Sequence, residues 1–170
     1  MSNASVLFFG DINIDNIFTV EEIPPPGRDA FTDQAQMKLG GAVCNSAVIL
    51  NGLGQNCAIL GAVGDDIWAD IVQQELASIG VNTDFIFRKK EKGTGLIFIA
   101  VIPDGERTMF SYRGANTTIT PQDLPKELLN NTGLVEFSGY AFMTSPQKDT
   151  AWRVLDMAKA RGIPCSLDTG

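Results

Sequence analysis

Two short polar segments of this sequence carry side chains that could bind a hydroxyl-rich ligand. The first runs from Gly10 to Asp15, where Asn13 and Asp15 follow an apolar stretch. A carboxylate only accepts hydrogen bonds, and it can accept them from two neighbouring hydroxyl groups, as a polyol offers. The segment therefore favours Asn13 and Asp15 as sugar ligands. An Asx turn at the end of a strand explains the same residues equally well.

The second segment begins with Gly40 and Gly41 and opens a predicted helix. Two glycines let the backbone approach a ligand closely, and the first N–H groups of a helix are oriented hydrogen-bond donors. Asn45, one turn further on, adds an amide that both donates and accepts. Such a site suits a neutral polyol or an anion, although a glycine-rich turn between a strand and a helix would look the same.

The residue inventory excludes several other chemistries. The 170 residues contain no histidine, which rules out His-ligated metals and Ser-His-Asp hydrolysis within them. Neither a GxxxxGK[ST] phosphate loop nor a GxGxxG dinucleotide fingerprint occurs. The three cysteines form no CxxC pair, and their odd number fits reduced thiols: Cys44, Cys57 and Cys165. We expect Asp65 and Asp66 to cap the helix that starts near Ile67 rather than to bind metal.

Composition and charge narrow the possible partners. Hydrophobic residues make up 44% of the chain and charged residues 19%, as in a folded globular protein. The 13 basic and 20 acidic residues give a net charge of −7, which argues against binding to nucleic acid or anionic lipid. No apolar run approaches the roughly 20 residues of a membrane span, and the N-terminus lacks the cationic start of a signal peptide. We therefore expect a cytoplasmic protein without nucleic acid or membrane partners.

The elements that must position these residues alternate between strand and helix. Four continuous apolar runs predict buried strands of one parallel sheet: 5–9, 57–64, 134–139 and 163–168. Three stretches with apolar residues at three- and four-residue spacing predict helices: 41–53, 67–79 and 147–161. This alternation indicates a layered α/β fold. We expect the cluster from Arg88 to Lys92 to be a solvated loop.

Two segments interrupt the alternation. Residues 15–37 contain the turn Pro24–Gly27 between β-compatible pieces, and residues 95–112 have the pattern of a hairpin. These strands have no crossover helices, so we expect them to form a small sheet separate from the main one. Such a sheet could serve as a lid over a site, as a dimer contact, or as both. The strand near Ile97 is apolar on both faces, which favours self-association.

The order of the motifs resembles the pfkB (ribokinase-like) carbohydrate kinases over nearly the whole chain. The segments that carry the resemblance are GDINID, GGAVCNSA, AVGDD, ELASIGV, KGTGLIFI, DGERTMFSYRGAN and ITPQDL. It implies a Rossmann-like, doubly wound, mostly parallel sheet with helices on both faces, plus a small β-sheet lid. It also implies ATP-dependent phosphorylation of a sugar or nucleoside hydroxyl with Mg²⁺. The lid in this family often pairs with that of a second subunit, so the resemblance implies a homodimer.

The resemblance also assigns residues. It implies a substrate-binding set of Asn13, Asp15, Gly40, Gly41, Asn45 and Arg113. Arg113 is included in this set because some sugar-acid kinases of the family bind substrate through an arginine in the segment that corresponds to YRGAN. Asp168 matches a strand-end position from which relatives help to hold the nucleotide phosphates or the metal.

The family's second signature, a glycine-rich segment ending in the catalytic aspartate, does not occur in residues 1–170. We therefore expect no catalytic base and no metal site here. We expect the chain to be the N-terminal part of one ribokinase-like domain without its nucleotide-binding part, and to be inactive alone. The alternatives are a nucleoside kinase of the same family and a catalytically silent sugar-binding or dimerisation fragment.

Overall fold

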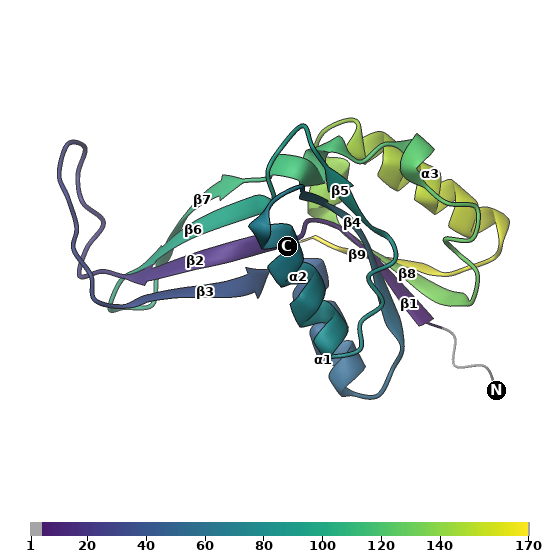
Figure 1. Cartoon of the computed structure of the whole chain (residues 1–170), viewed down its shortest axis with the longest axis horizontal. Coiled ribbons are helices and arrows are strands. Elements are labelled where there is room, and N and C mark those ends of the chain that lie inside the picture. Colours follow the sequence, from purple (N-terminus) through teal and green to yellow (C-terminus); the bar gives the residue numbers. More distant parts are fainter. Residues whose placement is uncertain (1–4, 170) are drawn as a thin grey trace.

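The computed structural model describes residues 5–169, which form two separate sheets (Figure 1). The main sheet has the order β5-β4-β1-β8-β9, and all its neighbouring strands are parallel. Its strands are β1 (Ser5–Phe9), β4 (Cys57–Gly64), β5 (Ile86–Lys89), β8 (Thr132–Ser138) and β9 (Cys165–Asp168). The four predicted strands are confirmed as strands of one parallel sheet, but the burial predicted for the last one is wrong, because all four residues of β9 are exposed. The loop expected around Arg88 was wrong in part, because Arg88 and Lys89 belong to the short strand β5.

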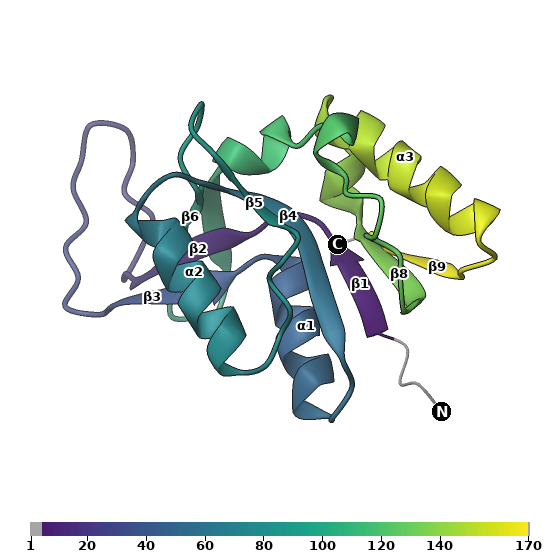
Figure 2. The same cartoon turned by 45° about the vertical axis from the view of Figure 1, so that its right-hand side comes forward.

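Helices cover both faces of the main sheet, as Figures 1 and 2 show. The helices are α1 (Ala42–Gly52), α2 (Ile67–Ser78) and α3 (Gln147–Ala160), close to the predicted ranges. Side chains alternate along β1, so Leu7 and Phe9 pack in the cluster that contains α3, whereas Phe8 packs in the cluster that contains α1 and α2. This burial on two sides explains why β1 is apolar from Val6 to Phe9.

The second sheet projects from the main domain (Figure 1). Its strands are β2 (Asn13–Thr19), β3 (Ala35–Gly40), β6 (Gly95–Val101) and β7 (Arg107–Tyr112), in the order β3-β2-β6-β7. The predicted separate sheet is therefore confirmed, and we call it the lid sheet. It extends beyond the predicted segments, because β2 begins at Asn13 and β3 ends at Gly40. Two candidate ligand residues, Asn13 and Gly40, consequently lie at the base of the lid sheet.

Three short 3₁₀ helices connect the two sheets and the last helix. They are η1 (Gly114–Thr118), η2 (Pro121–Asp123) and η3 (Gly139–Phe142). The fully buried Asn116 of η1 fixes the point where β1 passes into the lid sheet: its Oδ1 accepts from Ile12 N at 2.8 Å, and its Nδ2 donates to Ile12 O at 3.0 Å. Within residues 5–169, no helix has the length and apolar character that a bilayer crossing requires.

Candidate functional site

A cavity of about 220 Å³ lies where the end of β1 meets one face of the lid sheet. Its lining consists of Asp11, Asn13, Asp15, Gly41, Ile97, Ile99, Arg107, Met109, Ser111, Arg113 and Tyr140. Strand register explains this set, because Asp15 is paired with Ile97 and Ile97 with Ser111. Side chains at every second position then point to the same face. We call this face the inner face of the lid sheet.

Asp15 offers an open acceptor to the cavity. Its carboxylate makes no hydrogen bond or ion pair within residues 5–169, and its side chain is half-buried. Burial raises the pKa of Asp15 above 3.8, because the cavity wall removes water that would stabilise the charge. A half-buried carboxylate without a partner gains from a ligand hydroxyl that donates to it.

Asn13 also lines the cavity, and a hydrogen bond from Asn116 fixes its side-chain amide. Its Oδ1 accepts from Asn116 Nδ2 at 3.0 Å, and only 7% of the residue is exposed. Its Nδ2 has no partner in the described part of the chain and borders the cavity. Asn13 therefore presents a donor next to the Asp15 acceptor, which is the pairing that a sugar hydroxyl can use on both sides.

The two glycines at the start of α1 make room for these groups. A Cβ on Gly40 would overlap the carboxyl group of Asp15 on the neighbouring strand. Gly41 has φ +98°, a conformation that favours glycine, and a Cβ there would overlap the carbonyl oxygen of Asp11. Gly41 therefore requires glycine, whereas a side chain at Gly40 would displace the carboxyl group of Asp15.

Arg113 lies in the cavity wall, held by a buried network. Its Nε donates to Asp11 Oδ2 at 2.6 Å, and its Nη2 contacts Asp11 Oδ1, Tyr140 O and Gln147 Oε1 at 2.9, 2.8 and 2.6 Å. Gln147 Nε2 also donates to Asp11 Oδ1 at 2.8 Å. Nη1 has only a long contact to Thr144 Oγ1, at 3.4 Å. The charge of Arg113 is therefore balanced by Asp11, and Nη1 is its least engaged nitrogen.

Two predicted site residues lie outside the cavity lining. Asn45 is exposed on α1 and lines a separate groove of about 800 Å³, together with side chains of β3 and α2. Asp168 ends β9, where it is paired in register with Ser138. The structure thus brings together Asn13, Asp15, Gly41 and Arg113, with Gly40 packed behind Asp15.

Several residues of the site were not predicted from the sequence. Asp11, Gln147 and Asn116 form its buried polar frame, and Arg107 adds a second cation to the lining. Arg107 could have been found from the two-residue alternation along β7, once Ile97 and Ile99 were assigned to the inner face. Gln147 carries no such signal, because only the folded chain brings α3 to Asp11.

Of the two aspartates predicted to cap the helix, Asp66 does so, whereas the Asp65 side chain makes no hydrogen bond within residues 5–169. Asp66 Oδ1 accepts from Ala69 N at the start of α2, and Thr94 donates to the carboxylate through both its backbone N and its hydroxyl. Among residues 5–169, no three carboxylate or thiol groups converge on a point that could hold a metal ion.

The family model described as pfkB family carbohydrate kinase matches residues 3–169. The ribokinase of Staphylococcus aureus (strain COL) is 31% identical over 120 residues, which cover 70% of this chain and 40% of that protein. The fructokinase of Solanum tuberosum is 27% identical over 170 residues, covering 99% of this chain and 52% of that protein.

The fold recurs in solved structures. The fructokinase of Xylella fastidiosa superposes with a TM-score of 0.84 at 24% identity, covering 99% of this chain and 51% of that protein. The chain spans about half the length of the curated relatives that it matches.

Proposed function

Because this chain belongs to the pfkB family of carbohydrate kinases, we propose that its cavity binds a sugar whose hydroxyl group receives the γ-phosphate of ATP. One observation carries the proposal: the unpartnered, half-buried carboxylate of Asp15 faces the cavity beside the free amide donor of Asn13. Phosphoryl transfer depends chiefly on positioning and charge stabilisation, so a site that fixes the acceptor hydroxyl is one half of what it requires.

The remaining lining supports a small polyol. Asp15 would accept a hydrogen bond from one sugar hydroxyl, and the Asn13 amide would donate to another. Ile97, Ile99 and Met109 would cover the carbon skeleton and exclude water. Gly41 would let the backbone approach the ligand closely, and Gly40 would keep the space that Asp15 occupies.

The other assigned residues would act from the edge of the cavity or from outside it. Arg113 would donate a hydrogen bond to the substrate from Nη1, because Nε and Nη2 already donate to Asp11. Asn45 would contact substrate only from the neighbouring groove that it lines, and an alanine variant tests that role. Asp168 would face the nucleotide from the end of β9.

ATP and Mg²⁺ are part of the proposal through the family. Residues 5–169 contain no cluster that fits a metal ion, so we assign no metal ligand and no catalytic step to them. Asp168 remains the one carboxylate that we propose toward the nucleotide. We also propose a cytoplasmic location, with which the free cysteines are compatible.

We propose homodimerisation through the outer face of the lid sheet. Four large apolar side chains on that face are exposed, namely Met37, Phe98, Phe110 and Tyr112. Phe98 is paired with Phe110 and with Asn16, and Asn16 with Met37, so three of them lie in one row across the four strands. A row of this kind resembles the apolar centre of a protein interface.

The geometry supports a sugar better than a nucleoside. A nucleoside site would place aromatic rings against the base, but Phe98 and Phe110 belong to the outer face. The inner face carries Ile97, Ile99 and Met109 instead, and the aromatic side chain in the cavity lining, Tyr140, comes from η3 rather than from the lid sheet. The alternative of a catalytically silent binding module is decided by the assay that follows.

The test is ATP-dependent phosphorylation of a panel of pentoses, hexoses and nucleosides by the protein encoded by the complete gene. We expect turnover of at least one sugar, and a loss of about tenfold or more in kcat/KM in Asp15→Asn. Asp70→Asn, which removes an exposed carboxylate on α2, is the matched control and should leave kcat/KM unchanged. Turnover of no sugar, or equal values for both variants, would reject the proposal.

A further inference from the structure

The cavity lining contains two arginines, of which one has a carboxylate partner and the other has none within residues 5–169. Arg113 is held by Asp11, so its charge is balanced. Arg107, on β7, is exposed and makes no hydrogen bond or ion pair with any residue from 5 to 169. A guanidinium has five N–H donors suited to carboxylate and phosphate oxygens. Arg107 is therefore the cation of the lining that is free to meet a ligand.

Arg107 and Asp15 stand at opposite corners of the inner face. Asp15 shares a cross-strand row with Ile97 and Ser111, whereas Arg107 is paired with Val101. Ser111 and Arg107 are four positions apart along β7, or roughly 13 Å at about 3.3 Å per residue, and β2 lies two strands from β7, or roughly 10 Å at about 4.8 Å per strand. The arginine side chain extends several ångströms from its Cα, so the gap that remains is on the scale of one monosaccharide.

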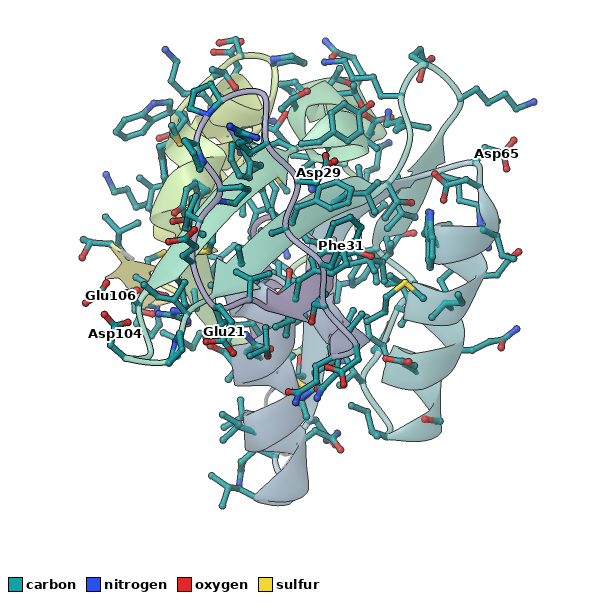
Figure 3. All side chains as sticks on the ribbon, turned by 90° about the vertical axis from the view of Figure 1, so that its left-hand side faces the viewer. Glu21, Asp29, Phe31, Asp65, Asp104 and Glu106 are labelled. Atoms are coloured by element: carbon teal, nitrogen blue, oxygen red, sulfur yellow. The ribbon has the colours of Figure 1, made fainter. Side chains whose placement is uncertain are left out.

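The acidic residues near Arg107 do not neutralise it. The turn before β7 contains Asp104 and Glu106, and Glu21 lies at the same end of the lid sheet, where Val20 N donates to Val101 O (Figure 3). Asp104 Oδ1 accepts instead from the backbone N of Glu106, at 2.9 Å. None of the three is within ion-pair distance of Arg107. A cation beside an apolar wall without a counter-charge gains from an anionic ligand group.

We propose that Arg107 binds an anionic group of the substrate, a phosphate or a carboxylate, at the end opposite the hydroxyls that Asp15 accepts. This inference rests on the proposed function and specifies its substrate class. It gives the cavity two poles, with an acceptor at Asp15 and a donor at Arg107, and the apolar side chains of Ile99 and Met109 between them. A neutral sugar would satisfy only one pole.

The test compares three compounds on the protein encoded by the complete gene. D-fructose carries no anionic group, D-fructose 6-phosphate carries a phosphate, and D-gluconate carries a carboxylate. Each is assayed for ATP-dependent phosphorylation and, separately, for binding by titration calorimetry. The variants are Arg107→Gln, the charge-preserving Arg107→Lys, and Arg153→Gln as a control that removes an exposed arginine on α3, outside the cavity lining.

We expect tighter binding and higher kcat/KM for one of the anionic compounds than for D-fructose. Arg107→Gln should lower that compound's kcat/KM about tenfold to a hundredfold, with a much smaller effect on D-fructose. Arg107→Lys should retain part of the preference, and Arg153→Gln should match the wild type. The compound that responds identifies the group as phosphate or carboxylate.

The proposal would be overturned if Arg107→Gln lowered kcat/KM equally for all three compounds. It would also be overturned if the kcat/KM values of Arg107→Gln matched those of Arg153→Gln. If no compound is phosphorylated, the proposed kinase function fails, but the calorimetry still decides the role of Arg107. Binding of an anionic compound that weakens in Arg107→Gln would support that role. Absence of binding by both anionic compounds would overturn it.

Discussion

The carboxylate of Asp11 and the guanidinium of Arg113 form a two-pronged ion pair, with Nε to Oδ2 at 2.6 Å and Nη2 to Oδ1 at 2.9 Å. Asp11 lies between β1 of the main sheet and β2 of the lid sheet, and Arg113 follows β7, the last strand of the lid sheet. The pair therefore fastens the chain where it enters the lid sheet to the chain where it leaves.

This pair is expected to contribute to stability as well as to the site. Asp11→Ala would leave the cation of Arg113 buried without its partner, and we expect it to lower the free energy of unfolding by about 3 kcal/mol. Asp70→Ala, which breaks the exposed ion pair with Arg88, should cost less than about 1 kcal/mol. Urea unfolding at neutral pH measures both. Equal losses would show that the buried pair has no special role.

A second prediction concerns pH and Asp15. Burial raises the pKa of this carboxyl above 3.8, so the carboxylate takes up a proton at a higher pH than an exposed aspartate. Sugar binding through an accepting carboxylate should therefore weaken, and KM should rise, as pH falls through the raised pKa. Asp15→Asn should lack this acid dependence. The measurement is KM for the preferred sugar against pH, and an identical acid limb in both proteins would contradict the assignment.

The same shift predicts the sign of a stability change. The folded state holds the Asp15 proton more tightly than the unfolded state, so the stability contributed by Asp15 decreases as pH rises from 3.8 through the raised pKa. Asp15→Asn carries no charge at any pH. We therefore expect it to be at least as stable as the wild type at pH 7 by thermal unfolding, although it binds sugar poorly. A clear loss of stability at pH 7 would indicate a structural role for the carboxylate.

Asp66 gives the opposite pH dependence. Burial alone would raise its pKa, but hydrogen bonds from Thr94, Ala69 and Trp68 outweigh burial and hold the pKa below 3.8. Its contribution is therefore present above the unfolded pKa and is lost as pH falls through the lower folded value. Asp66→Ala should lower the free energy of unfolding by about 1 to 2 kcal/mol at pH 7.

The neighbouring Asp65 provides the control for this variant. It is exposed at the start of α2, where Figure 3 shows it pointing away from the ribbon, and it makes no hydrogen bond within the described residues. Asp65→Ala should change the free energy of unfolding by less than about 0.5 kcal/mol. If the two variants have equal effects, then the cap at Asp66 does not stabilise α2.

The apolar outer face of the lid sheet predicts self-association. Phe110 is 66% exposed and is paired with Phe98, so a charge at Phe110 would enter the centre of the proposed interface. Phe110→Asp should convert a dimer into a monomer in light scattering during gel filtration. Trp152→Asp, which places a charge on the exposed face of α3, should leave the mass unchanged. A wild type that stays monomeric at high concentration would contradict the interface.

The sequence predicted the fold more completely than the site. Continuous apolar runs such as Ser5–Phe9 predict strands because both their faces are buried, and capping by Asp66 is a local effect. The short strand β5 was missed because Arg88 and Lys89 look like a solvated loop and gain their strand form only by pairing with β4.

The site was predicted where chain neighbours determine it and missed where distant segments meet. The sequence could place Asp15 near Gly40, because their motifs lie where β2 begins and where its antiparallel neighbour β3 ends. The contact of Asp11 with Gln147 could not, because 136 residues separate them and only packing of α3 brings them together. Asn45 lines a different groove from this cavity, and its role in substrate binding stays a prediction.

The most direct test is the position of a bound sugar in a crystal structure of the protein with its preferred substrate. We expect a substrate hydroxyl within hydrogen-bond distance of the Asp15 carboxylate, at about 2.5 to 3.0 Å, and a second one near Asn13 Nδ2. A sugar bound instead in the groove between α1 and α2, beside Asn45 and away from Asp15, would contradict the central claim.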